Sequence, residues 1–302
     1  MQLSVVVPTL DGREQLARTL EALSAHVPEA EVIVVNGPST DGTTGMVRDR
    51  ADVDVLVEVA DRTVTAARNA GIEQATGDVV AIVDQGLSVT EEWYDSLVAE
   101  FEDADVVSGP VHEQLRGGMT TEEVESDALA GREITYFNGG NVAFSRQALD
   151  ALDGFDEYLE IGSARDGAHR LAAMDFAVSW VPGMGVAREV GADGGGPGTD
   201  PGWKYRSLAY RLVKNYGVRP RVAARLLAHA GRDALGSLRD VARGDDTPSG
   251  WLGTGRTVIT GLAYGSKDGI WARLLDRSER RNPYGRSARS ARAVAVYDRR
   301  EH

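Results

Sequence analysis

The sequence predicts an α/β protein with an open, mostly parallel twisted sheet, helices on both faces of that sheet and a helical C-terminal extension. Three observations lead to this fold class. Strand-like apolar runs alternate with helix-like segments through the first two hundred residues. Several of these runs are apolar without interruption, which is typical of parallel strands buried on both faces. A Gly-rich segment over 191–202 then separates this part from a region with helical spacing.

The elements follow one another in a regular order. The first strand is expected over 3–7, where LSVVV precedes Pro8, and the segment 13–26 carries leucines at helical spacing. Further strands are expected over 31–36, 53–59, 78–84, 104–111 and 175–183, with helices over 39–51, 63–75 and 90–103. The polar residues 112–135 are expected to form a loop, and 137–152 a turn, a short strand and a helix.

The chain beyond the Gly-rich segment has a different character. Residues 203–243 are predicted to form a long amphipathic helix, which DDTPSG over 245–250 interrupts before a second helical piece. We therefore expect an α/β domain over 1–190, a linker over 191–202 and a basic helical extension over 203–302.

Composition and charge limit the classes of function. The 302 residues include no cysteine, which excludes disulfides and thiolate chemistry, and neither a signal peptide nor a membrane-spanning segment is expected. Residues 1–202 hold 12 basic against 37 acidic side chains, whereas 203–302 hold 21 against nine. The Asp-rich, Lys-poor surface favours a high-salt cytoplasm, with a GC-rich genome as the alternative. The basic extension suits either an anionic membrane surface or a solvated helix face, and no nucleic-acid-binding module is evident.

Short polar loops follow the predicted strands, at the sheet edge where α/β proteins bind ligands. PTLDG follows the first strand, NGPSTDG the second and DQG the fourth. Neither G-x-G-x-x-G nor a P-loop is present, so these two modes of phosphate binding are excluded. The remaining possibility is a nucleotide site built from side chains and the strand-terminal Asp84.

Four ordered motifs carry a resemblance to a known family. They are VVVPTLDG (5–12), EVIVVNGPSTDGT (31–43), ARNAGIEQATGDVVAIVDQG (67–86) and FNGGNVAFSRQALDALDGFDE (137–157). Together they resemble the family 2 glycosyltransferases of the GT-A fold over about residues 1–190. The last hundred residues carry no motif of this kind.

The resemblance implies a set of nucleotide-binding residues: Thr9, Asp11, Asn36, Arg68 and Asp84. It also implies a divalent cation, Mg²⁺ or Mn²⁺, held by Asp84, although Gly86 stands where the family has the second acid of its D-x-D motif. Each position has a structural alternative. Asp84 could end a strand or cap a turn, Asn36 could form a turn, and Thr9 and Asp11 could cap the helix that follows. Arg68 could contact the nucleotide or brace the loop after the fourth strand, or it could be a surface helix arginine in an ion pair.

The same resemblance assigns the acceptor side. Asn138, Gly139, Gly140 and Asn141 would shape the pocket between donor and acceptor, and Asp166, ahead of the pair Arg170-Leu171, would be the catalytic base. Asp156 and Glu160 are alternative bases. His169 is expected to be structural, and Arg188 is a candidate to take over part of the metal's charge role.

The resemblance implies an inverting glycosyltransferase that uses a nucleotide-diphosphate sugar. The expected acceptor is a glycan linked to polyprenyl (dolichyl) phosphate, in N-glycan or polysaccharide assembly. The expected location is cytoplasmic and peripheral, on the inner face of the membrane of a haloarchaeon. Two rivals remain: a degenerate, non-catalytic nucleotide-sugar-binding partner of another transferase, and a sugar-phosphate nucleotidyltransferase.

Overall fold

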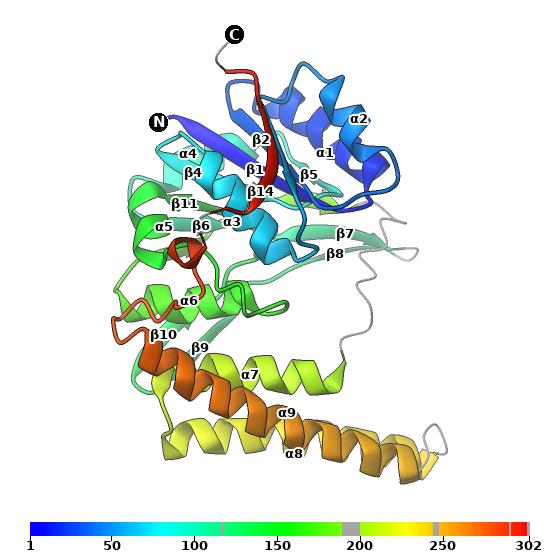
Figure 1. Cartoon of the computed structure of the whole chain (residues 1–302), viewed down its shortest axis with the longest axis vertical. Coiled ribbons are helices and arrows are strands. Elements are labelled where there is room, and N and C mark those ends of the chain that lie inside the picture. Colours follow the sequence, from blue (N-terminus) through cyan, green and yellow to red (C-terminus); the bar gives the residue numbers. More distant parts are fainter. Residues whose placement is uncertain (116–117, 189–199, 244–247, 290, 301–302) are drawn as a thin grey trace. The chain divides into compact units, whose positions relative to one another are not determined.

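The computed structural model describes residues 1–115, 118–188, 200–243, 248–289 and 291–300 (Figure 1). The chain forms two compact units. The first comprises Met1–Asp127, Glu133–Asp193 and Tyr284–His302, and the second comprises Ala128–Arg132 and Gly194–Pro283.

An eight-stranded sheet forms the centre of the first unit, in the order β12-β6-β11-β4-β1-β2-β3-β14. Its strands are β1 (Leu3–Thr9), β2 (Glu31–Asn36), β3 (Val55–Val59), β4 (Val79–Val83), β6 (Val106–Ser108), β11 (Asn141–Ser145), β12 (Val178–Trp180) and β14 (Ala293–Asp298). Strands β4, β1, β2 and β3 pair in parallel, as do β12 and β6, whereas β11 and β14 run antiparallel to their neighbours. The predicted mostly parallel α/β sheet is therefore confirmed.

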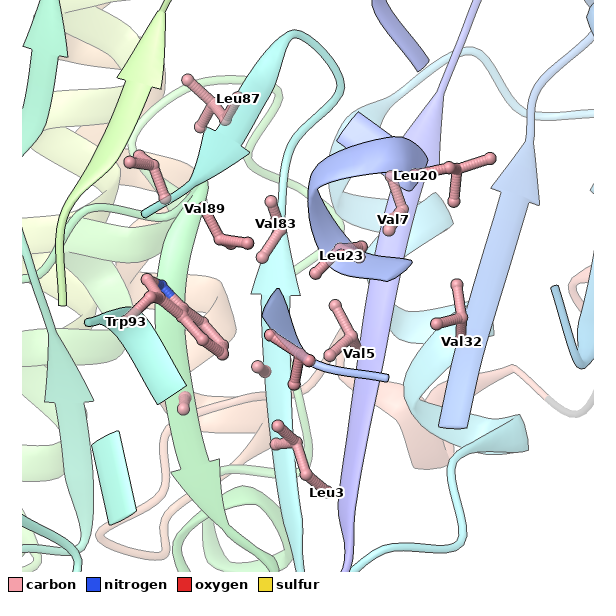
Figure 2. Packing of buried hydrophobic residues seen from close by; sticks show 14 of the residues in the cluster. Leu3, Val5, Val7, Leu20, Leu23, Val32, Val83, Leu87, Val89 and Trp93 are labelled. Atoms are coloured by element: carbon pink, nitrogen blue, oxygen red, sulfur yellow. The ribbon is translucent and has the colours of Figure 1, made fainter. Parts of the chain in front are cut away.

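Helices cover both faces of this sheet because its central strands are apolar throughout. The helices of the first unit are α1 (Arg13–His26), α2 (Thr43–Arg48), α3 (Val64–Gln74), α4 (Trp93–Glu100), α5 (Arg146–Leu152) and α6 (Ser163–Ala173). Val5 and Val7 of β1 pack in one cluster with the leucines of α1, as Figure 2 shows. Val6 points to the other face, where a Cβ added to Gly71 of α3 would lie 2.3 Å from its Cγ1. The alternation of a strand thus places successive valines against different helices.

The predicted loop over 112–135 contains strands instead. Strand β7 (Val111–Leu115) pairs with β8 (Gly118–Thr121) and β13 (Val186–Arg188), and β13 pairs with β5 (Leu87–Val89) in a four-stranded sheet. Strands β9 (Ser126–Leu129) and β10 (Arg132–Thr135) form a separate ribbon. Antiparallel strands that leave one face to water keep polar side chains there, which is why the sequence resembled a loop.

The helical C-terminal region is confirmed, but two helices form where one was expected over 203–243. Helix α7 (Pro201–Tyr216) ends at Gly217, whose φ is 75°, and α8 (Pro220–Arg243) and α9 (Pro248–Leu275) follow as separate helices. Most of the predicted linker, 191–199, lies outside the described residues. Among the described helices, none is both long enough and apolar enough to cross a membrane.

The chain from Tyr284 onward belongs to the first unit, whereas the helical extension was expected to run over 203–302. Strand β14 pairs antiparallel with β3 at the edge of the central sheet. Arg292 fixes this return, because its buried guanidinium forms ion pairs with Glu73 of α3 and with Glu157. The alternating residues AVAVYD were the available strand signal.

Within the second unit, three glycines let α9 pack directly on the backbone of α7. A Cβ at Gly261, Gly265 or Gly269 would lie 2.4, 2.1 or 2.7 Å from the carbonyl oxygen of Gly202, Arg206 or Tyr210, respectively. Because these glycines recur every fourth residue, they line one side of α9. Larger residues at these positions would push the two helices apart.

Candidate active site

The ends of three parallel strands of the first unit meet at one edge of the sheet. Thr9 at the end of β1 pairs in register with Asn36 at the end of β2. Gln85, two residues after the end of β4, accepts hydrogen bonds from the Thr9 hydroxyl and, over 3.0 Å, from the backbone N–H of Leu10. The structure therefore brings the first three sequence motifs together.

Asn36 is buried beneath this edge, with only 1% of its surface exposed. Its amide Nδ2 donates to the Thr44 hydroxyl over 2.8 Å, and its Oδ1 accepts from the Ser39 hydroxyl over 2.7 Å. Both polar ends of the side chain are thus engaged, one by the loop after β2 and one by the first turn of α2. In this arrangement Asn36 holds the β2–α2 connection in place.

Asp11 does not cap helix α1. Its backbone has a φ of 47°, and the N-cap residue is Gly12, which makes no side-chain capping bond. The Asp11 carboxylate instead accepts from the backbone N–H of Thr40 over 2.7 Å and lies 3.4 Å from Arg62 Nη2. It ties two loops together and is 37% exposed, so it remains open to a ligand.

Asp84, the strand-terminal acid, forms an ion pair with Arg68 of α3. Arg68 Nη2 donates to both carboxylate oxygens, over 2.9 and 2.8 Å. The Arg68 side chain is only 7% exposed, whereas that of Asp84 is 33% exposed. The pair agrees with the alternative in which Arg68 braces the loop after the fourth strand, and it presents Asp84 at the site with its charge partly compensated.

The two glycines of the fourth motif are required by this pair. A Cβ at Gly140 would lie 2.5 Å from Asp84 Oδ2, and one at Gly139 would lie 3.0 Å from Arg68 Nη1. The backbone N–H of Asp84 donates to Gly140 O over 3.0 Å, which holds the strands together at this point. Any side chain at Gly140 would therefore displace the Asp84 carboxylate.

The two asparagines of this motif differ in exposure and contacts. Asn141 is fully buried, accepts from Trp93 Nε1 over 2.9 Å and donates to Met184 O over 2.7 Å, so it joins α4 to a loop. Asn138 is part-exposed, and its Nδ2 donates to Glu122 Oε2 over 2.7 Å. Only Asn138 of the two is placed to meet a ligand.

Asn138 opens onto a pocket of about 370 Å³ in the first unit. Three glutamates, three aromatic residues and one arginine also line this pocket: Glu122, Glu123, Glu125, Tyr136, Phe137, Trp180 and Arg165. Hydrogen bonding to Glu125, with which Arg165 forms an ion pair, raises the pKa of the Arg165 guanidinium. These acids were missed because they lie in the segment expected to be a loop, and its Glu-rich composition was the available signal.

Asp166 is completely buried on α6. Its Oδ2 accepts from Arg170 Nε over 2.8 Å, and both side chains have no exposed surface. Arg170 also donates to Leu152 O over 2.7 Å and to Gly154 O over 3.0 Å, which fixes the turn after α5. A carboxylate in this position does not reach an acceptor hydroxyl, so the geometry does not favour the predicted role of Asp166 as base.

The other candidates of this region are placed as follows. Asp156 is buried and accepts from the backbone N–H of Tyr158 over 3.0 Å, whereas Glu160 is exposed. His169 is buried with its ring edge-on to Tyr136, as expected of a structural histidine. Arg188 lies on β13 in register with Leu87, three residues after Asp84.

Residues 4–152 match the model of glycosyl transferase family 2. The chain carries a family 2 glycosyltransferase domain. It is similar to the glycosyltransferase AglE of Haloferax volcanii (29% identity over 46% of this chain and 42% of AglE) and to the glucosyl-dolichyl phosphate glucuronosyltransferase of the same organism (31% over 37% and 38%). It is also similar to the undecaprenyl-phosphate mannosyltransferase of Micrococcus luteus (29% over 63% and 86%). The chain thus spans less than half the length of both Haloferax relatives.

Solved structures show the same fold at low sequence identity. The mannosyltransferase PcManGT from Pyrobaculum calidifontis, solved with GDP-Man and Mn²⁺, matches at 18% identity with a TM-score of 0.55, over 89% of this chain and 87% of its own. Residues 1–349 of S. aureus TarS, solved with UDP-GlcNAc, match at 17% identity with a TM-score of 0.61, over 94% and 89%. The GT-A fold of the transferase domain is therefore confirmed.

The donor set of the transferase domain does not fit a preformed divalent metal site. Asp84 is engaged by Arg68 through both oxygens, and Gly86 at the second D-x-D position has no side chain. Among the residues that the structure describes, no group of three or more His, Asp or Glu could hold a metal ion. Mg²⁺ and Mn²⁺ prefer several oxygen ligands, and here the protein offers one shared carboxylate.

Proposed function

We propose that this chain is an inverting glycosyltransferase that moves a sugar from a nucleotide-diphosphate sugar to an acceptor. The observation that supports it most is the convergence of Thr9, Asp11 and Asp84 on one sheet edge of a family 2 transferase domain. The backbone amides of the surrounding loops would supply positive potential for a diphosphate, and Arg68 offsets the negative charge of Asp84 that would repel it. Inversion is taken from the family resemblance.

The acceptor hydroxyl has to lose a proton as the sugar is transferred. In this proposal Glu122 takes it, because its carboxylate is exposed in the pocket and is oriented by Asn138. Asp166 was the predicted base, and its burial with Arg170 supports a positioning role instead. Loss of turnover by a folded Glu122→Gln variant supports this assignment, and turnover by Asp166→Asn is compared under conditions in which that variant is folded.

The acceptor in this proposal is a glycan on polyprenyl phosphate, in line with the name of the Haloferax glucosyl-dolichyl phosphate glucuronosyltransferase. The name of the Micrococcus relative contains a polyprenyl phosphate without a sugar. Such an acceptor is anchored in a membrane. The protein would therefore work in the cytoplasm, peripherally on the inner face of the membrane, in glycan assembly. The basic helical region is the part of the chain suited to anionic lipid.

A second candidate function is nucleotide-sugar binding without turnover, as the partner of an active transferase. Two observations favour it: Asp84 has no second acid beside it, and Asp166 is sequestered from solvent. The family match argues against the other rival, a sugar-phosphate nucleotidyltransferase.

Thermal unfolding in high KCl with UDP, GDP and their sugar conjugates, each with and without Mn²⁺ or Mg²⁺, tests the binding site. A ligand at a hundred times its dissociation constant adds about 2.7 kcal/mol of stability. Stabilisation that Asp84→Asn abolishes supports the site, and release of nucleotide from the sugar conjugate supports turnover. No stabilisation by any nucleotide would refute both candidate functions, and binding without turnover would leave only the second.

A further inference from the structure

One side of helix α9 is apolar and exposed. Six residues, here called the apolar stripe, are each at least 42% exposed: Ile259, Tyr264, Ile270, Trp271, Leu274 and Leu275. The glycines of α9 face α7, so the helical spacing leaves the stripe on the surface of the second unit. Exposed apolar patches of this extent mark interaction sites in soluble proteins.

The charges on α9 are almost entirely positive. Arg256 and Lys267 are exposed on the helix. Asp268 is the single acidic residue between Pro248 and Leu275, and its carboxylate pairs with Arg206 of α7 over 2.8 Å. The stripe therefore runs beside basic side chains, without an exposed carboxylate that would repel an anion.

A notch of about 390 Å³ continues the stripe at the C-terminal end of α9. Apolar Val218, Ile270 and Leu274 line it together with Arg273, Arg277 and Arg281, and it is here called the arginine notch. Ile270 and Leu274 belong to both features. The notch thus joins an apolar surface to three guanidinium groups.

The positive charge of the notch is not neutralised within the second unit. Over the described residues, none of Arg273, Arg277 and Arg281 forms a salt bridge with a carboxylate. Arg273 donates to the carbonyl oxygens at the end of α7, and Arg281 donates to Asp276 O over 2.9 Å. Burial lowers the pKa of Arg273, and the charge of Arg281 beside it lowers that pKa further. An anion in the notch would relieve this repulsion.

We propose that the apolar stripe and the arginine notch together dock the protein on an anionic lipid bilayer. The stripe enters the interface between head groups and acyl chains, and the notch binds a lipid phosphate. This deepens the membrane association proposed above, because it names the surface that makes contact.

Charge complementarity favours lipid over a second copy of this chain. Two copies pairing symmetrically through this face would bring two positively charged surfaces together, since the same surface of each copy is used. Anionic lipid instead supplies phosphates for the notch and an apolar phase for Trp271. Tryptophan prefers this boundary because its ring is apolar and its N–H is polar.

Flotation of the full chain with phosphatidylglycerol vesicles, compared with phosphatidylcholine vesicles, tests the proposal. We expect wild type to float with phosphatidylglycerol, and Arg277→Glu to bind roughly thirtyfold more weakly at low salt, because each charge contributes about fivefold. The pair Trp271→Ser and Leu274→Ser should weaken binding at both low and high salt, since burial of apolar groups is not screened. Brominated lipid should quench the fluorescence of wild type more than that of Trp271→Phe.

Two matched controls lie on the first unit. Arg18→Glu makes the same change of charge on an exposed arginine of α1, and Val294→Ser removes an apolar side chain that is 71% exposed. Both should float as wild type does. Circular dichroism of each variant checks that its helices are kept.

The proposal is overturned if the wild-type protein binds neither kind of vesicle, or if the variants of the apolar stripe and the arginine notch float as the wild-type protein does. Concentration-dependent dimerisation that Trp271→Ser abolishes, without vesicle binding, would assign the face to a second copy instead. Flotation needs no nucleotide-sugar and should be unchanged in Asp84→Asn. Loss of turnover with intact flotation would thus refute the proposed transferase function alone.

Discussion

Replacing Asp166 by Asn should destabilise the first unit severely. The substitution keeps the shape of the side chain but removes the charge that compensates the buried guanidinium of Arg170. Removing one partner of a buried ion pair costs about 3–5 kcal/mol, because the other charge is left uncompensated away from water. Domains are stable by only about 5–15 kcal/mol, so this is a large share of the total.

Urea unfolding at a fixed KCl concentration, followed by circular dichroism, measures this loss. The matched control is Asp150→Asn, which removes an ion pair with Arg286 whose carboxylate side is 57% exposed and which should cost less than about 1 kcal/mol. The double variant Asp166→Asn with Arg170→Met removes both charges and should recover part of the stability. If Asp166→Asn unfolds at the urea concentration of wild type while losing turnover, Asp166 is a catalytic residue and the positioning role is refuted.

Three further changes test separate parts of the structure. Gly140→Ala should abolish nucleotide stabilisation in thermal-shift assays, because its Cβ would lie 2.5 Å from Oδ2 and 3.0 Å from Cβ of Asp84 and would displace that side chain; intact binding would contradict this. Gly265→Ala should cost about 1–3 kcal/mol in thermal unfolding, since its Cβ meets the backbone of α7, whereas Gly253→Ala, with nothing within 4 Å, should stabilise α9 slightly. Burial and the charge of Arg225 lower the pKa of His229, so the unfolded chain takes up its proton first as pH falls through 6.5. Stability should therefore drop over this range in wild type and less in His229→Gln; equal slopes in thermal melts would refute the assignment.

The convergence of the strand ends could be predicted because parallel strands place their carboxyl ends at one edge. Thr9, Asn36 and Asp84 each follow an uninterrupted apolar run, and that pattern alone sets their side of the sheet. Which of these side chains face a ligand could not be predicted. Exposure depends on the side-chain hydrogen bonds that form after the strand ends, such as those of Asn36 with Ser39 and with Thr44 of α2.

The ion pair between Asp166 and Arg170 could have been predicted from the spacing of the two residues. Asp166 and Arg170 are four residues apart on a helix, the separation at which an acid and a base lie on the same face. What spacing does not show is depth. Burial of the pair follows from Arg170 reaching carbonyl groups after α5, a contact between segments far apart in the sequence.

The loss of the second acid after β4 and the pairing of Asp84 with Arg68 are consistent with each other. Two adjacent carboxylates repel, and a divalent cation relieves that repulsion while it binds the diphosphate. Here Gly86 removes one carboxylate, and Arg68 compensates the other from a position that is 7% exposed. The edge is then close to neutral without a metal. A diphosphate arriving there would meet a carboxylate whose charge Arg68 already offsets, and Gly139 and Gly140 leave room for that ion pair.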